Sequence, residues 1–99
     1  MNSEKVLSLL GFAAKAGKLS FGTHATQFAI ESGKAKLVLA AEDISEKSVK
    51  ELNFKANKKS ITVLNLKGIS TAELSKRVGK NCGILAVTDQ GFADAITKI

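Results

Sequence analysis

The sequence lacks the residues that mark several classes of protein. It contains no proline, tyrosine or tryptophan, and a single cysteine among 99 residues. One cysteine cannot form an internal disulfide, which favours a reducing, cytoplasmic environment. The opening residues, MNSEKVLSLL, show no basic segment followed by a sustained apolar run, so they do not predict a signal peptide. The longest apolar run, residues 37–41, is too short to span a membrane.

Residues that bind metals or cofactors are also scarce. One histidine and one cysteine do not provide a structural zinc site, and neither a Walker motif nor a GxGxxG fingerprint is present. The adjacent acids Glu42 and Asp43 could hold magnesium, or they could instead cap the next turn or bind the free N–H groups of the helix that follows. The second interpretation is the simpler one, and the sequence implies neither a metal nor a cofactor.

Lysine is the residue that the sequence has in excess. Fifteen basic residues against nine acidic ones give a net charge of +6, and Arg77 is the one arginine. A small basic domain suits a polyanionic partner, most commonly nucleic acid, and lysine favours phosphates over the bidentate contacts that base edges require. The alternative is that the lysines only keep the surface soluble.

Helix and strand signals alternate along the chain with no linker or repeat. With 44% apolar residues, the chain is expected to form a single domain over residues 1–99. The expected helices begin at caps, and the caps are Ser3, Thr23, Ser45, Ser70 and Thr88-Asp89. The expected strands cover residues 18–21, 36–41, 61–64 and 83–87. This alternation predicts an α/β sandwich around a small mixed sheet.

The helix after Gly22 begins with the most informative segment. Four residues at helical spacing are expected to form its buried or semi-buried stripe: Ala25, Phe28, Ala29 and Ser32. Its first turn offers free N–H groups and the positive end of the helix dipole, and Gly22 allows another backbone to approach closely. His24 could donate to a phosphate or a base edge there. The alternative is an ordinary helix start that Thr23 caps beside a solvated histidine.

A polar segment near the C-terminus offers a second candidate site. Residues 79–83 are flanked by glycines, and Lys80 and Asn81 provide hydrogen-bond donors, although the segment could simply be a flexible connection. Cys82 could pair with His24 as the nucleophile and base of an enzyme. No third residue that would orient such a pair is evident, and cysteine is among the most often buried residue types.

A resemblance to a known family covers essentially the whole chain. It rests on short segments in order, with the opening LLGFAAKAGKLSFG and the ending AVTDQGFADAI: Gly22-Thr23, Ala29-Ile30-Glu31, Gly33, Ala35-Lys36-Leu37-Val38 and Ala41-Glu42-Asp43. Together they resemble the kink-turn RNA-binding ribosomal proteins, the superfamily of the archaeal seven-Ae and eukaryotic thirty-e proteins. The two ends of the chain are similar to its bacterial YlxQ-type branch.

The resemblance implies a three-layer α/β/α sandwich with a four-stranded mixed sheet, and a protein that is not an enzyme. It also implies one RNA-binding face made from residues 22–27, 42–45 and 79–83. The RNA-binding residues expected there are Gly22, Thr23, His24, Gln27, Glu42, Lys80, Asn81 and Cys82. Lys34 and Lys36, beyond the second helix, could grip a flanking strand or merely solubilise the protein.

The sequence departs from the family pattern at the tip of that helix. His24 stands where the family has Asn, Ala25 where it has Glu, and Phe28 where it has Lys. His24 can still donate to a guanine, and Gln27 offers a replacement amide. Ala25 cannot accept from a guanine amino group, and Phe28 cannot pair with a phosphate. Losing one base contact and one phosphate contact predicts an affinity lower by about two or more orders of magnitude.

The sequence therefore predicts a ribosome-associated protein that binds kinked or structured RNA, and its basic surface favours a monomer. A protein–protein adaptor that kept the fold and lost the RNA site is the alternative, motivated by Ala25 and Phe28. An exposed Phe28 would favour the adaptor, whereas helical spacing predicts that Phe28 is buried.

Overall fold

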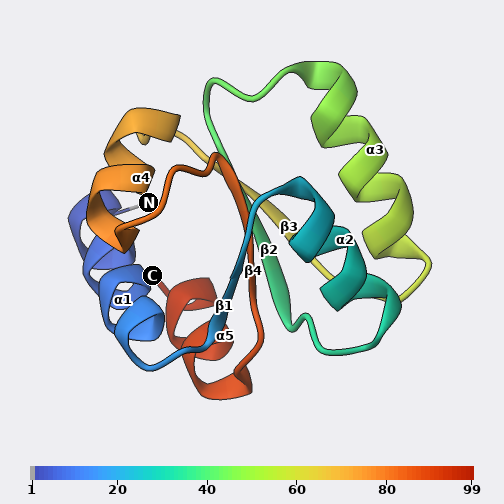
Figure 1. Ribbon diagram of the computed structural model, residues 1–99, viewed down its shortest axis with the longest axis horizontal. Coiled ribbons are helices and arrows are strands. Elements are labelled where there is room, and N and C mark those ends of the chain that lie inside the picture. Colours follow the sequence, from blue (N-terminus) through green and yellow to red (C-terminus); the bar gives the residue numbers. More distant parts are fainter. Residues whose placement is uncertain (1) are drawn as a thin grey trace.

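Helices and strands alternate throughout the computed structural model, which describes residues 2–99 (Figure 1). The elements are α1 (Ser3–Lys15), β1 (Leu19–Phe21), α2 (Thr23–Glu31), β2 (Leu37–Ala41), α3 (Glu46–Asn57), β3 (Val63–Leu66), α4 (Thr71–Val78), β4 (Ile84–Val87) and α5 (Gln90–Thr97). Helices α1, α4 and α5 lie on one side of the sheet and α2 and α3 on the other. The predicted three-layer α/β/α sandwich is confirmed. Within residues 2–99, no helix has the length and apolar character needed to cross a bilayer.

The last strand lies inside the sheet rather than at its edge. The strand order is β1-β4-β2-β3, with β4 antiparallel to β1 and β2, and β3 parallel to β2. An antiparallel neighbour begins where the strands beside it end. The upper edge of the sheet, as Figure 1 shows it, is therefore the edge where Phe21, Ala41 and Leu66 end their strands and Ile84 begins β4.

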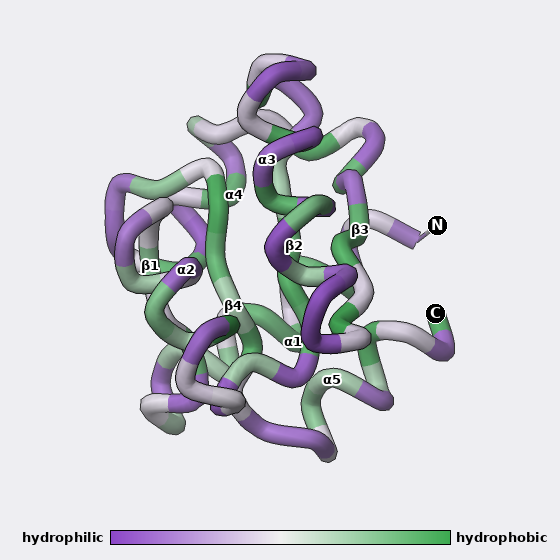
Figure 2. The backbone as a smooth tube through the Cα atoms, turned by 90° about the vertical axis from the view of Figure 1, so that its right-hand side faces the viewer, coloured by the Kyte–Doolittle hydropathy of each residue, from purple (hydrophilic) through white to green (hydrophobic). Residues whose placement is uncertain are grey.

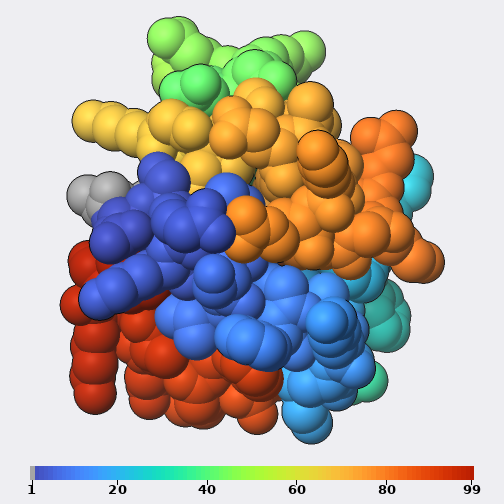
Figure 3. Space-filling model, turned by 90° about the vertical axis from the view of Figure 1, so that its left-hand side faces the viewer, coloured from blue at the N-terminus to red at the C-terminus, as the bar shows by residue number. Residues whose placement is uncertain are grey.

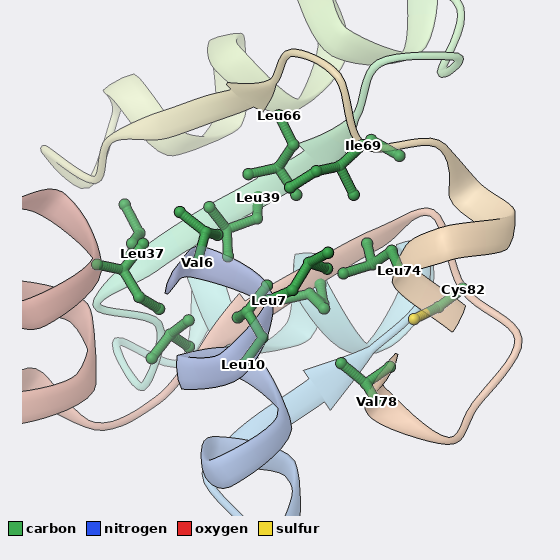
Figure 4. Close-up of a cluster of buried hydrophobic side chains, with 14 of the residues drawn as sticks. Val6, Leu7, Leu10, Leu37, Leu39, Leu66, Ile69, Leu74, Val78 and Cys82 are labelled. Carbon is green, nitrogen blue, oxygen red and sulfur yellow. The ribbon is translucent and has the colours of Figure 1, made fainter. Parts of the chain in front are cut away.

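The two central strands build both halves of the core. Every residue of β2 is buried, as expected of a strand covered on both faces. Leu39 and Leu85 are register partners in the cluster under α1, α4 and α5, which Figure 4 shows. Val38 and Ala86 are partners in the second cluster, under α2 and α3. Figure 2 shows the apolar colour along β2 and β4.

Most of the predicted helix caps are present, with small shifts. The confirmed caps are Ser45 for α3, Ser70 with Glu73 for α4, and Asp89 for α5. The prediction for α1 was wrong by one residue, because Asn2 Oδ1 accepts the Lys5 N–H at 3.2 Å and Ser3 is already helical.

The third strand begins two residues later than predicted. The Ile61 N–H donates to Ala56 O at 2.9 Å, which uses Ile61 to close the end of α3. Pairing with β2 starts at Thr62, whose carbonyl accepts the Val38 N–H at 3.0 Å. The observed strand is therefore Val63–Leu66 rather than residues 61–64.

The predicted buried stripe of α2 was wrong at three of its four residues. The buried residues are Thr26, Ala29 and Ile30, while Ala25 and Ser32 are exposed and Phe28 is 65% exposed. The helix is turned by about one residue, or ~100°, from the predicted orientation. In this orientation Ile30 joins the apolar cluster of α2 and α3, and the ring of Phe28 points away from it.

Thr26 provides a test of this packing. Its side chain is completely buried, and Oγ1 has no hydrogen-bond partner. A buried hydroxyl without a partner is destabilising, so Thr26→Val is expected to raise the free energy of unfolding by about 1 kcal/mol. Urea denaturation of both proteins measures the difference. The matched control is Thr71→Val, which removes a hydroxyl that donates to Asp43 and should lower stability instead. A destabilised Thr26→Val protein would contradict the observed packing of α2.

Candidate nucleic-acid interface

The three segments implied as a binding face meet at the upper edge. The Gly22 N–H donates to Ile84 O at 2.8 Å, which joins the start of α2 to the start of β4. The Ala41 N–H donates to Gly83 O at 2.8 Å, which joins the end of β2 to the same loop. In Figure 3 the loop before β4, in orange, projects beside the cyan segment that follows β1. Segments distant in sequence are thus fixed side by side by backbone hydrogen bonds.

The start of α2 is open, unlike the starts of the other four helices described in residues 2–99. Those four are capped by side chains, whereas the N-cap of α2 is Gly22, with φ 89° and ψ 170° and no side-chain hydrogen bond. Thr23 is the first helical residue, so the prediction that it caps α2 was wrong. Thr23, His24 and Ala25 are exposed, and the first turn contains no acidic residue. Its N–H groups therefore face solvent without a competing carboxylate.

The acidic pair after β2 has a structural role. Glu42 Oε1 accepts the Gly68 N–H at 3.0 Å. Asp43 Oδ1 accepts both the hydroxyl and the N–H of Thr71, at 2.6 and 2.9 Å. These bonds tie the turn before α3 to the start of α4 and to the turn that precedes it. A carboxylate does bind helix N–H groups, but in α4 rather than in α3, the helix that follows the pair in the sequence. Within residues 2–99, no three His, Cys, Asp or Glu side chains gather as a metal site.

The hydrogen bonds at Asp43 also favour its charged form. The Thr71 hydroxyl, and then the Thr71 N–H, lower the pKa of the Asp43 carboxyl. The positive end of α4 acts in the same direction, because Thr71 is the first residue of that helix. The start of α4 is thus occupied by protein groups, while the start of α2 is open.

Gly83 is closely packed where the loop reaches β4. A Cβ at this position would lie 2.5 Å from Thr71 Oγ1 and 2.6 Å from Ile44 Cδ1. Any side chain here would therefore displace the Thr71 hydroxyl, which binds Asp43, or the end of the Ile44 side chain. Glycine here leaves both side chains in place.

The loop before β4 is held by Ser75, which is not among the predicted site residues. The Cys82 N–H donates to Ser75 Oγ at 2.9 Å, and the Ser75 hydroxyl lies 3.0 Å from Cys82 O. Lys80 and Asn81 remain exposed between these anchors. The Lys80 Nζ atom lies 5.6 Å from the centre of the Phe21 ring, so its charge is placed beside the end of β1. A serine one turn before the glycine that ends a helix was the available signal.

Cys82 does not form a catalytic pair with His24. Its side chain is 6% exposed and belongs to the cluster under α1, α4 and α5 (Figure 4), and burial raises the pKa of the thiol. His24 is exposed on α2, which covers the opposite face of the sheet. A nucleophilic cysteine needs an accessible thiolate, so the dyad hypothesis was wrong. Cys82 can offer a ligand little more than its backbone.

The remaining predicted site residues divide between the two edges. Gln27 is half-buried in the second turn of α2, near the upper edge. Lys34 and Lys36 are exposed at the opposite edge, where the Lys36 N–H donates to Val87 O at the end of β4, at 2.7 Å. The structure therefore does not bring the two lysines to the open start of α2.

A cavity of about 350 Å³ adjoins the interface between the start of α3 and the end of β3. Its floor is apolar and its rim carries charges of both signs; the lining residues are Ala41, Glu42, Ile44, Glu46, Val49, Lys50, Asn65 and Lys67.

Comparison with known proteins matches residues 4–97 to the model of the ribosomal protein L7Ae/L30e/S12e/Gadd45 family. The chain belongs to this family. It is 35% identical over 92 residues to the RNA-binding protein YlxQ of Enterococcus faecium, covering 93% of this chain and 87% of that protein. It is 33% identical over 100 residues to RNA-binding protein YlxQ of Bacillus subtilis, covering 100% and 98% of the two chains. The predicted membership of the YlxQ-type branch is confirmed.

Solved structures agree on the fold. A Bacillus halodurans protein of unknown function superposes with a TM-score of 0.88 at 29% identity, covering 95% of this chain and 94% of that one. The 15.5kD RNA binding protein of Giardia lamblia superposes with a TM-score of 0.82, covering 98% and 86%. The second likeness, at 19% identity, concerns the fold alone.

The link between Asp43 and Thr71 predicts a pH-dependent loss of stability. Because folding lowers the pKa of Asp43, its charged form stabilises the folded state fully above the unfolded pKa of about 3.9. This contribution is lost as the pH falls through the lower, folded-state pKa. Asp43→Asn should therefore be less stable than the parent protein at pH 7, and the difference should shrink below about pH 4.

Urea denaturation between pH 7 and pH 3 measures this difference. Asp94→Asn is the control, since it makes the same change in net charge at a carboxylate that contacts Gln90 within α5. Equal effects of the two substitutions at every pH would contradict a specific role for Asp43.

Proposed function

We propose that this protein binds structured RNA through the upper edge of its sheet. The observation that carries the proposal is the open start of α2, whose exposed N–H groups lie beside the loop that presents Lys80. A helix start with no side-chain cap attracts anions through its N–H groups and its dipole. The family supports RNA as the anion, because the two YlxQ relatives bear the name RNA-binding protein.

Each exposed group of this face suits a different part of an RNA. The N–H groups of Thr23, His24 and Ala25 suit phosphate oxygens, and so does the Lys80 ammonium. The side chains of His24 and Asn81 can donate to base edges in a helix that is opened or distorted. Phosphate contacts would position the protein, and the few base contacts would select the site.

A kink-turn is the RNA shape that we propose as the preferred target. The open start of α2 supports this. The major groove of regular RNA is too narrow for protein groups to enter, so the end of a helix can reach the bases only where a kink widens that groove. Ala25 removes one family contact with a guanine, so His24 and Gln27 would carry more of the selection. We also propose that the target is ribosomal RNA, and that the protein is cytoplasmic and monomeric.

A protein–protein adaptor is the second candidate function. The exposure of Phe28 favours it, because an aromatic ring at 65% exposure is suited to a partner. The two candidates differ in whether RNA binds the upper edge.

A titration with three RNAs tests the proposal. The RNAs are a kink-turn, the same RNA with its G·A pairs changed to Watson–Crick pairs, and a plain duplex, each at 50 mM and 200 mM salt, on the order of the range over which phosphate contacts weaken. We expect the kink-turn to bind most tightly, and every affinity to fall with salt. Equal affinities for all three RNAs would exclude kink-turn selection, and no binding would favour the adaptor.

Two lysine substitutions locate the binding face. Lys80→Gln should weaken kink-turn binding by about two- to fivefold and reduce the salt slope by about one unit, because it removes a phosphate contact. Lys36→Gln makes the same charge change at the opposite edge and should have a smaller effect. An equal loss for both would show that the lysines act only through net charge. Gly22 is a poor probe, because at φ 89° any side chain would also strain the backbone.

A further inference from the structure

Three phenylalanines stand out on the surface because they are almost equally exposed. Phe12 is 62% exposed, Phe28 65% and Phe54 63%. The Lys58 ammonium covers Phe54, 4.4 Å from the ring centre. Phe12 lies on α1, on the far side of the sheet from α2. Phe28 is the one of the three that belongs to the helix with the open start.

The position of Phe28 on α2 relates it directly to the candidate interface. It follows His24 by four residues, so the two side chains lie on the same face of the helix, about 6 Å apart along its axis. Both are exposed, whereas the opposite face of α2 packs on the sheet through Thr26 and Ile30. An aromatic ring therefore continues the surface that begins at the uncapped N–H groups.

The neighbours of Phe28 do not form the apolar patch that a protein partner would need. On the helix surface they are His24, Ala25, Glu31 and Ser32, all exposed, and Ala25 is the one apolar residue among them. Protein interfaces concentrate their apolar residues in a core, and a lone ring among polar groups does not provide one. An exposed flat ring surrounded by polar groups suits a flat ligand with polar edges, such as a nucleic-acid base.

We propose that Phe28 is a stacking site for an unpaired base of the bound RNA, with His24 holding the adjoining phosphate or base edge. The inference rests on the proposed RNA binding and names the part of the RNA that this helix face contacts. Unpaired bases stack on exposed aromatic rings, whereas paired bases in a duplex do not present a free face. Net charge complements this ligand, since the chain carries +6 and the loop beside the start of α2 presents Lys80. Phe28 stands where the family pattern has a lysine, so the helix would contact a base here rather than a phosphate of the RNA backbone.

The test compares phenylalanine variants on one RNA. The RNA is the kink-turn described above, with each unpaired nucleotide replaced in turn by an abasic site. Phe28→Ala should weaken binding by about 5- to 100-fold, the effect of one lost stacking contact. Phe12→Ala and Phe54→Ala are matched by exposure and should change the affinity less than about twofold. Circular dichroism verifies that all variants are folded.

Two further comparisons identify stacking as the cause. Phe28→Tyr keeps the ring and should bind like the parent, whereas Phe28→Leu keeps apolar volume without the ring and should bind like Phe28→Ala. One abasic position should weaken the parent protein as much as Phe28→Ala does, and should not weaken the Phe28→Ala variant further.

The outcomes separate this inference from the proposed function. If Lys80→Gln weakens binding and Phe28→Ala does not, the RNA-binding face stands and the stacking site is overturned. Parent-like binding by Phe28→Leu would also overturn stacking, because it assigns the contact to apolar volume. If the parent binds none of the RNAs, the proposed function and the stacking site both fall.

Discussion

The position of β4 between β1 and β2 is the constraint on which the candidate interface depends. Its antiparallel ladder places the loop before β4 at the edge where β1 and β2 end. Two backbone hydrogen bonds, from Gly22 to Ile84 and from Ala41 to Gly83, then fix the start of α2 and the end of β2 to that loop. A parallel β4 would have placed the loop at the opposite edge, beside Lys36.

The starts of α4 and α2, both at this edge, differ in whether protein side chains bind their N–H groups. The start of α4 is filled by protein groups, because Ser70 caps it and Asp43 binds Thr71. The start of α2 has no side-chain cap. Gly22 has a positive φ, a backbone conformation that glycine adopts more readily than any other residue. The closed start stabilises the edge, and the open start leaves donors for a ligand. Gly83 lies against the start of α4, where a Cβ would meet the Thr71 and Ile44 side chains, and the next residue, Ile84, accepts the Gly22 N–H at the start of α2.

The exposed side of α2 is separate from the side that packs on the sheet. The chain belongs to the L7Ae/L30e/S12e/Gadd45 family, and the backbone features of the implied face are present. His24, Ala25 and Phe28 lie on the exposed side of that helix, away from the core. Substitutions on this exposed side can therefore leave the fold intact, because the core side of α2 is made by Thr26, Ala29 and Ile30.

Local signals in the sequence determined the order of the elements and the caps at Ser45, Ser70 and Asp89. These depend on residues that are neighbours in the chain, so pattern and hydrogen-bonding chemistry are sufficient.

The sequence did not determine which side of α2 faces the sheet. Ala25 with Phe28 and Thr26 with Ile30 are both compatible with a short amphipathic helix, and only the surface beneath the helix distinguishes them. Tertiary structure likewise decided that Cys82 points into the core and that Asp43 binds the start of α4 rather than α3. It also decided that Ser75 holds the loop, because these contacts join segments whose distance in space follows from the strand order.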